Sequence, residues 1–446
     1  MLTAFSLKDF KSFREATLPL GSLTVLIGAN AAGKSNAIEA LRLLSWLAQG
    51  QKLASIQYAV NSADRVVRGR LEDLCHRGAT RFALGCHTDD RVWNRLEMQI
   101  TVRDGELHIT GEQVDAVGDN LPLYTMDRPS QNLSTDAGVA YNNFARGGNK
   151  PHVTVSDQMA VFVQLESAAR FEAGHKKAQE TIPAVAKRLQ TTLSNILFLD
   201  PVPARMREYS FTSDKRLLGD GTNLSSVLHR LWGRDAESTS EPFAGQRQAI
   251  LDFIKSLPEQ DISGLSFLDG PRGEVMVQLQ ETFGGQPRAY DASLLSDGTL
   301  RVLAIAAAML SAPEGSLVVI EEIDNGVHPS RARHLLDSIR LIAERRGLRV
   351  LLSTHNPALL DALPDAAVPD VVFCYRDPDS GASKLVKMNS IPDVPELLVQ
   401  GPLGHLMTSG ALERFVKTHK GSEDRKQKAK AWLESLRVGM PIKTPV

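Results

Sequence analysis

The hydrophobic pattern changes several times along the chain. From Leu2 to Phe10 apolar residues alternate with polar ones, which predicts a strand that runs into a turn at Lys11–Arg14. Leu23–Ile27 is a continuous apolar run, as expected for a strand that is buried on both faces. After a glycine-rich turn, apolar residues recur every three or four positions from Lys34 to Leu47 and predict a helix of about three turns.

The middle of the chain is less regular. Residues 80–115 have the pattern of short strands, whereas residues 118–150 are rich in Asn, Asp, Gly, Ser and Pro and predict a long loop or insert. Residues 155–260 have a mostly helical pattern that strand-like residues 195–202 interrupt. We therefore expect a mainly helical subdomain to be inserted between two more regular parts.

From about residue 265 onward, strands alternate with helices. The predicted strands are residues 274–280, 317–320, 349–353 and 370–377, with helices beginning near 297, 329 and 357. This alternation predicts a parallel sheet with helical crossovers, so the expected fold class is α/β. The expected parts are a first lobe at 1–115, an inserted loop and helical arm at 116–265, a second lobe at 266–395 and a C-terminal helical tail at 396–446.

Composition narrows the cellular setting. Lys and Arg number 51 and Asp and Glu number 52, so the net charge of −1 does not by itself indicate a nucleic-acid partner. Three cysteines in 446 residues argue against a disulfide framework and fit a reducing compartment. The first residues lack the apolar run of a signal peptide, and Val302–Leu310 is far shorter than the ~20 residues of a membrane helix. We expect a cytoplasmic protein without membrane contact.

A phosphate-binding loop follows the first buried strand. Residues 28–35 match the pattern G-x-x-x-x-G-K-[ST], between a predicted strand and a predicted helix, where this motif belongs. Its glycines allow successive N–H groups to point at phosphate oxygens, and the helix N-terminus adds favourable partial charge. Lys34 is expected to reach the β- and γ-phosphates of ATP, and Ser35 to bind Mg²⁺. The expected nucleotide contacts are Gly28, Ala29, Asn30, Ala31, Ala32, Gly33, Lys34, Ser35 and Asn36.

A second part of the site is predicted at an acidic strand end. Residues 317–320 are apolar, and Glu321 and Glu322 follow them directly. Ligands of open α/β sheets lie at the carboxyl ends of strands, so this pair is expected beside the phosphate-binding loop. We assign Glu321 to the metal ion and Glu322 to the water that attacks the γ-phosphate.

Two further motifs follow in a fixed order. Residues 295–299 read Leu-Ser-Asp-Gly-Thr and open a helix, and His355 follows the predicted strand 349–353. In this order the motifs resemble the ABC ATPases. The resemblance implies that Ser296 and Gly298 form a signature loop facing the γ-phosphate on another subunit, and that His355 is a switch histidine at the γ-phosphate.

The resemblance is more specific than the superfamily. About 260 residues separate Ser35 from the signature loop, far more than in transporter ATPases. The segments FKSFREATLPLGSLTVLIGANAAGKSN, LSDGT, IEEIDNGVHPS and STHNPALL resemble the predicted ATPases called AAA15 and AAA21, relatives of RecF, SMC, Rad50 and OLD proteins. The resemblance is looser in the middle, through ILFLDPVPARMR.

This family resemblance implies a split ATPase head with an inserted arm and an ATP-dependent, head-to-head dimer. It also implies nucleotide contacts from Lys11, Phe13 and Arg14, a Q-loop metal contact from Gln113, and a dimer-facing loop at 324–326. Two residues depart from the usual pattern. Glu321 stands where Asp is usual, and Asp297 replaces a signature glycine, so its carboxylate must point away from phosphate or cap its own helix.

Three roles for ATP are compatible with these motifs. The first is a sensor ATPase of anti-phage defence that acts with a separate effector protein, and the second is a RecF-like ATPase of DNA repair or maintenance. The third is an OLD-like nuclease, which is disfavoured because only about 90 residues follow His355. The basic residues between Lys417 and Lys430 could contact a DNA backbone or form a solvated helix face. We expect the defence role.

Overall fold

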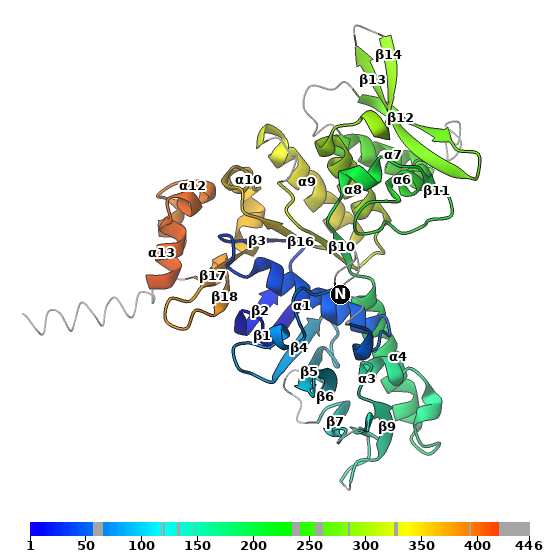
Figure 1. Cartoon of the computed structure of the whole chain (residues 1–446), viewed down its shortest axis with the longest axis vertical. Coiled ribbons are helices and arrows are strands. Elements are labelled where there is room, and N and C mark those ends of the chain that lie inside the picture. Colours follow the sequence, from blue (N-terminus) through cyan, green and yellow to red (C-terminus); the bar gives the residue numbers. More distant parts are fainter. Residues whose placement is uncertain are drawn as a thin grey trace, which may run out of the picture.

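The computed structural model describes residues 1–56, 66–116, 118, 121–131, 134–147, 149–233, 241–254, 262–283, 286–324, 329–391 and 394–418. Its strands form three sheets (Figure 1). The fold class is α/β, as predicted.

The central sheet is largely parallel and follows the predicted alternation of strands and helices. Its order is β10 (Leu197–Leu199), β15 (Leu317–Ile320), β16 (Arg349–Thr354), β3 (Leu23–Ile27), β17 (Val371–Arg376) and β18 (Ser383–Lys387). Only the β17–β18 pair is antiparallel. The predicted buried strand β3 therefore lies inside the sheet, between two strands that come more than 300 residues later.

The second sheet is antiparallel throughout and has eight strands. Its order is β2 (Phe13–Pro19), β1 (Leu2–Phe10), β4 (Arg81–Thr88), β5 (Arg95–Arg103), β6 (Glu106–Asp115), β7 (Tyr124–Arg128), β8 (Asp136–Tyr141) and β9 (His152–Ser156). The loop predicted for residues 118–150 is wrong in part, because β7 and β8 lie within it. Buried Tyr124, Met126 and Val139 give these strands an apolar face, which the surrounding turn residues concealed. The boundary expected at 115/116 falls between two strands of this sheet.

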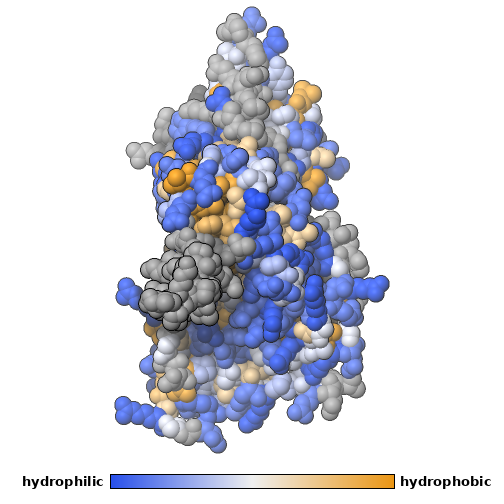
Figure 2. Space-filling model, turned by 90° about the vertical axis from the view of Figure 1, so that its left-hand side faces the viewer, coloured by the Kyte–Doolittle hydropathy of each residue, from blue (hydrophilic) through white to orange (hydrophobic). Residues whose placement is uncertain are grey.

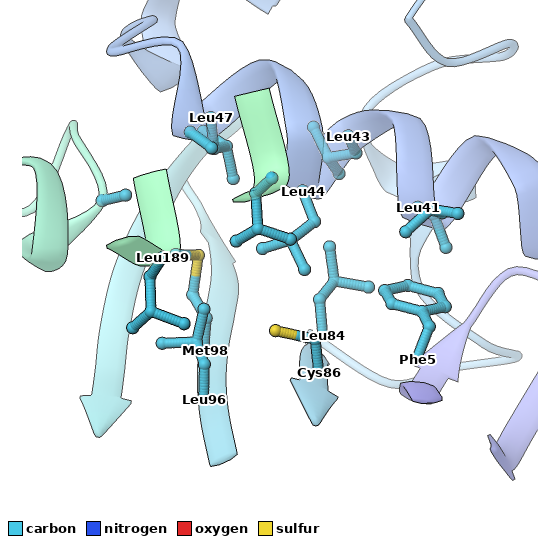
Figure 3. Close-up of a cluster of buried hydrophobic side chains, with 14 of the residues drawn as sticks. Phe5, Leu41, Leu43, Leu44, Leu47, Leu84, Cys86, Leu96, Met98 and Leu189 are labelled. Atoms are coloured by element: carbon cyan, nitrogen blue, oxygen red, sulfur yellow. The ribbon is translucent and has the colours of Figure 1, made fainter. Parts of the chain in front are cut away.

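Helix α1 (Lys34–Ala48) joins these two sheets. Its leucines Leu41, Leu43, Leu44 and Leu47 point toward the antiparallel sheet, where Figure 3 shows them against apolar side chains of β4 and β5 and against Leu189 of α4 (Lys176–Ser194). All four leucines are fully buried. Because burying a leucine side chain contributes about 1.5–3 kcal/mol, this packing fixes the helix that carries the phosphate-binding loop.

The third sheet lies at the other end of the molecule. It consists of β11 (Ser210–Phe211), β12 (Ile262–Asp269), β13 (Glu274–Phe283) and β14 (Gln286–Asp291), and lies beside α6 (Leu224–Trp232) and α7 (Glu241–Ile254) (Figure 1). The remaining helices are α3 (Val161–Gln164), α5 (Pro203–Met206), α8 (Asp297–Ser311), α9 (Pro329–Arg346), α10 (Pro357–Asp361), α11 (Val394–Leu398), α12 (Leu403–Thr408) and α13 (Ala411–Thr418). Helices α3 to α7 confirm in part the helical pattern predicted for 155–260, and residues 234–240 and 255–260 of that range lie outside the described residues.

The side of the molecule that carries α12 and α13 is mostly hydrophilic. Figure 2 shows this side, with hydrophobic residues in small groups between hydrophilic ones. Among the helices within the described ranges, none combines the length and the apolar character that a bilayer span requires.

A buried carboxyl connects the antiparallel sheet to α3 and gives a prediction about pH. Glu112 accepts hydrogen bonds from the backbone N–H groups of Val161 at 2.7 Å and Phe162 at 2.8 Å, and from the Tyr124 hydroxyl at 2.7 Å. Burial raises the pKa of Glu112 from 4.5 to about 7. The folded protein therefore holds this proton where the unfolded chain has lost it, so stability decreases as pH rises from 4.5 through about 7.

We expect Glu112→Gln to remove this part of the pH dependence. Relative to the variant, the wild-type chain should lose up to about 3 kcal/mol of unfolding free energy between pH 5 and pH 8. Urea unfolding at both pH values measures the difference. Glu106→Gln, on the same strand with a 72% exposed side chain, is the matched control and should keep the wild-type slope. Equal slopes for wild type and Glu112→Gln would contradict the prediction.

Candidate active site

The carboxyl ends of β3, β15 and β16 meet at one edge of the central sheet. The three strands are parallel, with Ile320 paired to Leu352 and Leu352 paired to Val25. A pocket of about 390 Å³ lies at this edge. It is lined by Ala29, Asn30, Ala31, Gly33, Lys34, Ser35, Asn36, Arg68, Glu321, Glu322, Ser353, Thr354, His355 and Arg376. The predicted phosphate-binding loop, acidic pair and histidine therefore come together.

Two positions of the loop require glycine, because neighbouring strands approach them closely and because their φ angles are positive. Gly28 has φ +149°, and a Cβ there would lie 2.2 Å from the carbonyl oxygen of Cys374. Gly33 has φ +122°, and a Cβ there would lie 2.4 Å from the hydroxyl oxygen of Ser383. Both distances are too short for any side chain, so only glycine lets β17 and β18 pack against the loop.

Lys34 closes the loop on itself. Its ammonium donates hydrogen bonds to the carbonyl oxygens of Gly28 at 2.5 Å and Ala29 at 3.1 Å. Burial is the main cause that lowers the pKa of Lys34, while nearby Glu322 and Asp324 are among the groups that oppose this shift. A phosphate group can replace the two carbonyl oxygens as the acceptor, and its negative charge would further favour the ammonium.

The two acidic residues have different surroundings. Glu321 accepts a hydrogen bond from Arg42 of α1 at 2.5 Å, whereas Glu322 is exposed at the pocket. Burial raises the pKa of Glu321, and the charge of Arg42 opposes this rise. Glu322 has φ +47°, in the left-handed region, and its N–H donates to the Ser353 hydroxyl at 3.1 Å. Such a backbone is uncommon for a residue other than glycine, and here the turn directs the two carboxylates differently.

His355 lies beside the carboxylate of Asp324. Its Nδ1 lies 3.8 Å from Asp324, which accepts a hydrogen bond from the Thr354 hydroxyl at 2.7 Å. The His355 side chain is 45% exposed, so it can reach a ligand in the pocket. Asp324 belongs to the predicted dimer-facing loop, whose other residues, 325 and 326, lie outside the described residues.

The turn predicted to contact nucleotide supports the loop from behind instead of lining the pocket. Phe13 is fully buried in the core, and Lys11 forms an ion pair with Glu39 of α1 and donates to the Arg68 carbonyl oxygen at 2.7 Å. Arg14 is exposed but does not line the pocket. Between them, Ser12 accepts a hydrogen bond from Asn36 at 2.8 Å and one from Ser383 at 2.8 Å. Lys11, Phe13 and Arg14 do not line the pocket in this structure, and their contacts with nucleotide stay a prediction.

Other predicted residues lie outside this pocket. Gln113 is on β6 of the antiparallel sheet, where its amide donates to Asp115 at 3.3 Å, and it does not line the pocket; its metal contact stays a prediction. Ala32 is buried below the loop, and its carbonyl oxygen accepts from Ser383 at 2.5 Å. Ser296 and Gly298 lie at the start of α8 and do not line the pocket.

The sequence motifs did not predict two cationic side chains of the pocket, Arg68 and Arg376. Arg68 forms an ion pair with the buried Glu39, and Arg376 donates to the Ala31 carbonyl oxygen at 3.1 Å. Arg376 ends β17, which is parallel to the strand before the loop, and this placement could have suggested it. Arg68 belongs to no sequence motif, and it comes to lie beside α1 only through the tertiary fold. Together with Lys34, they give the pocket three cationic side chains, which suits a polyphosphate.

The oxygen donors of the pocket fit a magnesium ion. Ser35 offers a hydroxyl, and Glu321 and Glu322 offer carboxylates, which are the hard oxygen ligands that Mg²⁺ prefers. Mg²⁺ usually keeps several waters and few protein ligands, so this small donor set is sufficient. Arg42 occupies one oxygen of Glu321, which leaves Ser35, Glu322 and the second oxygen of Glu321 as candidates.

This arrangement of a strand, a phosphate-binding loop, a helix and an acidic strand end is typical of P-loop ATPases. Two sequence families match the chain. Residues 1–75 match the family described as "AAA ATPase domain", and residues 174–361 match the family described as "AAA domain, putative AbiEii toxin, Type IV TA system". Together with the relatives below, these matches support an ABC-type ATPase of the RecF/SMC class, in agreement with the resemblance drawn from the motifs.

Two curated proteins are similar to parts of the chain. The chromosome partition protein Smc of Rhodopirellula baltica is 26% identical over 224 residues, which cover 46% of this chain and 17% of that protein. The DNA replication and repair protein RecF of Gloeobacter violaceus is 32% identical over 125 residues, which cover 26% of this chain and 29% of that protein. The chain thus spans less than a third of either relative's length.

Solved structures of SMC head domains are similar over most of the chain at low identity. The Smc head from Pyrococcus furiosus, bound to the C-terminal domain of ScpA, has 14% identity and a TM-score of 0.46, covering 90% of this chain and 98% of that one. The SMC head from Thermotoga maritima has 14% identity and a TM-score of 0.37, covering 86% and 98%.

The close approach at Gly28 gives a prediction for nucleotide binding. We expect Gly28→Ala to weaken ATP binding at least tenfold, because its Cβ must displace the Cys374 carbonyl and open the loop. Titration with a fluorescent ATP analogue measures the change. Gly78→Ala is the matched control, since Gly78 also has a positive φ of +79° but nothing lies within 4 Å of its Cβ position. The prediction fails if both variants bind with wild-type affinity.

Proposed function

We propose that this protein is an ATP-binding and ATP-hydrolysing switch that works as a head-to-head dimer. The observation that carries the proposal is the division of its motifs. The phosphate-binding loop, acidic pair and His355 line one pocket, whereas Ser296 of the signature loop is exposed elsewhere, at the start of α8. A second copy that presents its Ser296 to the pocket would complete two equivalent sites.

Each pocket residue then has a role that its surroundings support. Lys34 exchanges its loop carbonyl oxygens for the β- and γ-phosphates, and Arg68 and Arg376 add positive charge at the rim. Glu322, the more exposed of the two carboxylates, orients and deprotonates the attacking water. Glu321 and Ser35 hold Mg²⁺, and His355 contacts the γ-phosphate while Asp324 orients its ring.

The cellular role we propose is that of the regulatory ATPase in an anti-phage defence system with a separate effector protein. Support comes from the family matched by residues 174–361, whose description refers to a toxin of a toxin–antitoxin system. The pocket described above would supply the ATP-dependent step of such a system.

A RecF-like role in DNA repair is the alternative, and one observation favours it. The similarity to RecF reaches 32% identity over 125 residues, the higher identity of the two curated relatives above. The basic segment considered for DNA contact lies outside the described residues from position 419 onward. Its first residue, Lys417, forms an ion pair with Glu413 on α13, as in an ordinary solvated helix face.

ATP turnover in the presence and absence of DNA tests these proposals. We expect slow hydrolysis that Glu322→Gln reduces at least a hundredfold while ATP affinity stays within about threefold, because the amide cannot accept the proton of the attacking water. Glu314→Gln, which changes an exposed carboxylate before the opposite end of β15, is the control and should keep wild-type turnover.

The response to DNA separates the two cellular roles. Stimulation by linear, circular or single-stranded DNA would favour the RecF-like alternative, and indifference to all three would favour a protein trigger. Full activity in Glu322→Gln would show that the acidic pair has been assigned wrongly.

A further inference from the structure

One short segment connects the acidic strand end to the signature loop. Strand β10 pairs with β15, and the N–H of Glu321 donates to the Leu199 carbonyl oxygen at 3.1 Å. Helix α5 follows β10 and ends at Met206, and Arg207 is its C-cap residue. The Arg207 guanidinium donates to the Leu295 carbonyl oxygen at 3.0 Å and to the Asp297 carboxylate at 2.6 Å. Arg207 therefore bonds to the residues on both sides of Ser296, Leu295 and Asp297.

The segment around α5 is itself held firmly. Arg205 forms an ion pair with Asp220 at 2.6 Å, and the Val202 N–H donates to the Asp220 carbonyl oxygen at 2.9 Å. Gly221 approaches so closely that a Cβ there would lie 2.5 Å from the sulfur of Met206. Arg207 thus extends from a fixed support toward the signature loop.

Asp297 is the residue that departs from the usual signature, and the structure explains how its charge is accommodated. It does not cap its helix, because Ser296 accepts the capping hydrogen bond from the Thr299 N–H at 3.2 Å. Its side chain is 65% exposed, and the preceding residue Ser296 is exposed as well. Without a partner, this carboxylate would repel a phosphate that approaches Ser296.

We propose that Arg207 is a positioning residue that neutralises Asp297 and fixes the signature loop, so that Ser296 can meet the nucleotide of a second copy. This inference rests on the proposed dimer. It assigns the loop's geometry to the segment that also borders Glu321, so displacement of the acidic strand end by nucleotide would be transmitted to the dimer surface.

The ion pair between Arg207 and Asp297 is not expected to be needed for folding. The pair with Asp297 is partly exposed, at 29% and 65% of the two side chains, and exposed ion pairs contribute little to folding stability. Variants of either residue should therefore fold. Arg205→Ala is the matched control, since Arg205 lies two residues before Arg207, in α5, and forms an ion pair of the same length, but with Asp220 instead of the signature loop.

The test uses the full chain with Glu322→Gln, so that bound ATP is not consumed. Sedimentation velocity over a range of protein concentrations measures ATP-dependent dimerisation. We expect Arg207→Ala to weaken it at least tenfold and Arg205→Ala to change it less than threefold. Adding Asp297→Asn to Arg207→Ala should restore at least half of the loss on a logarithmic scale, because the uncompensated charge is gone. Binding of a fluorescent ATP analogue to the monomer should stay within twofold in every variant.

The outcomes are distinguishable. If the Glu322→Gln parent stays monomeric with ATP although it binds ATP, the proposed dimer fails and this inference fails with it. If the parent dimerises and Arg207→Ala dimerises equally well, only this inference is overturned. If Arg207→Ala weakens dimerisation but Asp297→Asn restores nothing, charge neutralisation is overturned.

Discussion

The parallel pairing of β16 with β15 on one side and β3 on the other is the constraint on which the nucleotide pocket depends. Each of these strands ends in a loop that carries part of the chemistry, and only a parallel register brings the three ends to one edge. A shift of one residue would turn the buried side chains of β3 to the opposite faces and move Lys34 away from Glu322.

Ion pairs around α1 then hold the side chains of the pocket in position. Glu39, which is 5% exposed, forms ion pairs with Lys11 and with Arg68, and Arg42 pairs with Glu321. One helix thus holds the phosphate-binding loop at its N-terminus, one cation of the pocket through Glu39, and the Glu321 carboxylate through Arg42. Buried charges are costly unless they are paired, so these partners constrain one another strongly.

The sequence predicted the placement of site residues where the signal is local, and it missed contacts that depend on the tertiary fold. The loop at 28–35, the acidic pair and His355 were predicted because each follows an apolar run that forms a strand. Strands β7 and β8 were missed because they are short and lie among turn residues. Arg68, Arg376 and Arg207 act through partners that are distant in sequence, and no periodic pattern records such contacts. Phe13 and Gln113 were placed by resemblance, and their side chains lie in the core and on another sheet.

The position of β3 has a consequence for biosynthesis. Its two sheet neighbours, β16 and β17, begin at residues 349 and 371, so a growing chain carries β3 without them for more than 300 residues. At a synthesis rate of about 5–20 residues per second, this interval is about 15–65 s. An apolar strand with unpaired edges is prone to associate with other chains. The packing of α1 on the antiparallel sheet, complete once α4 has emerged, would restrain β3 during that wait.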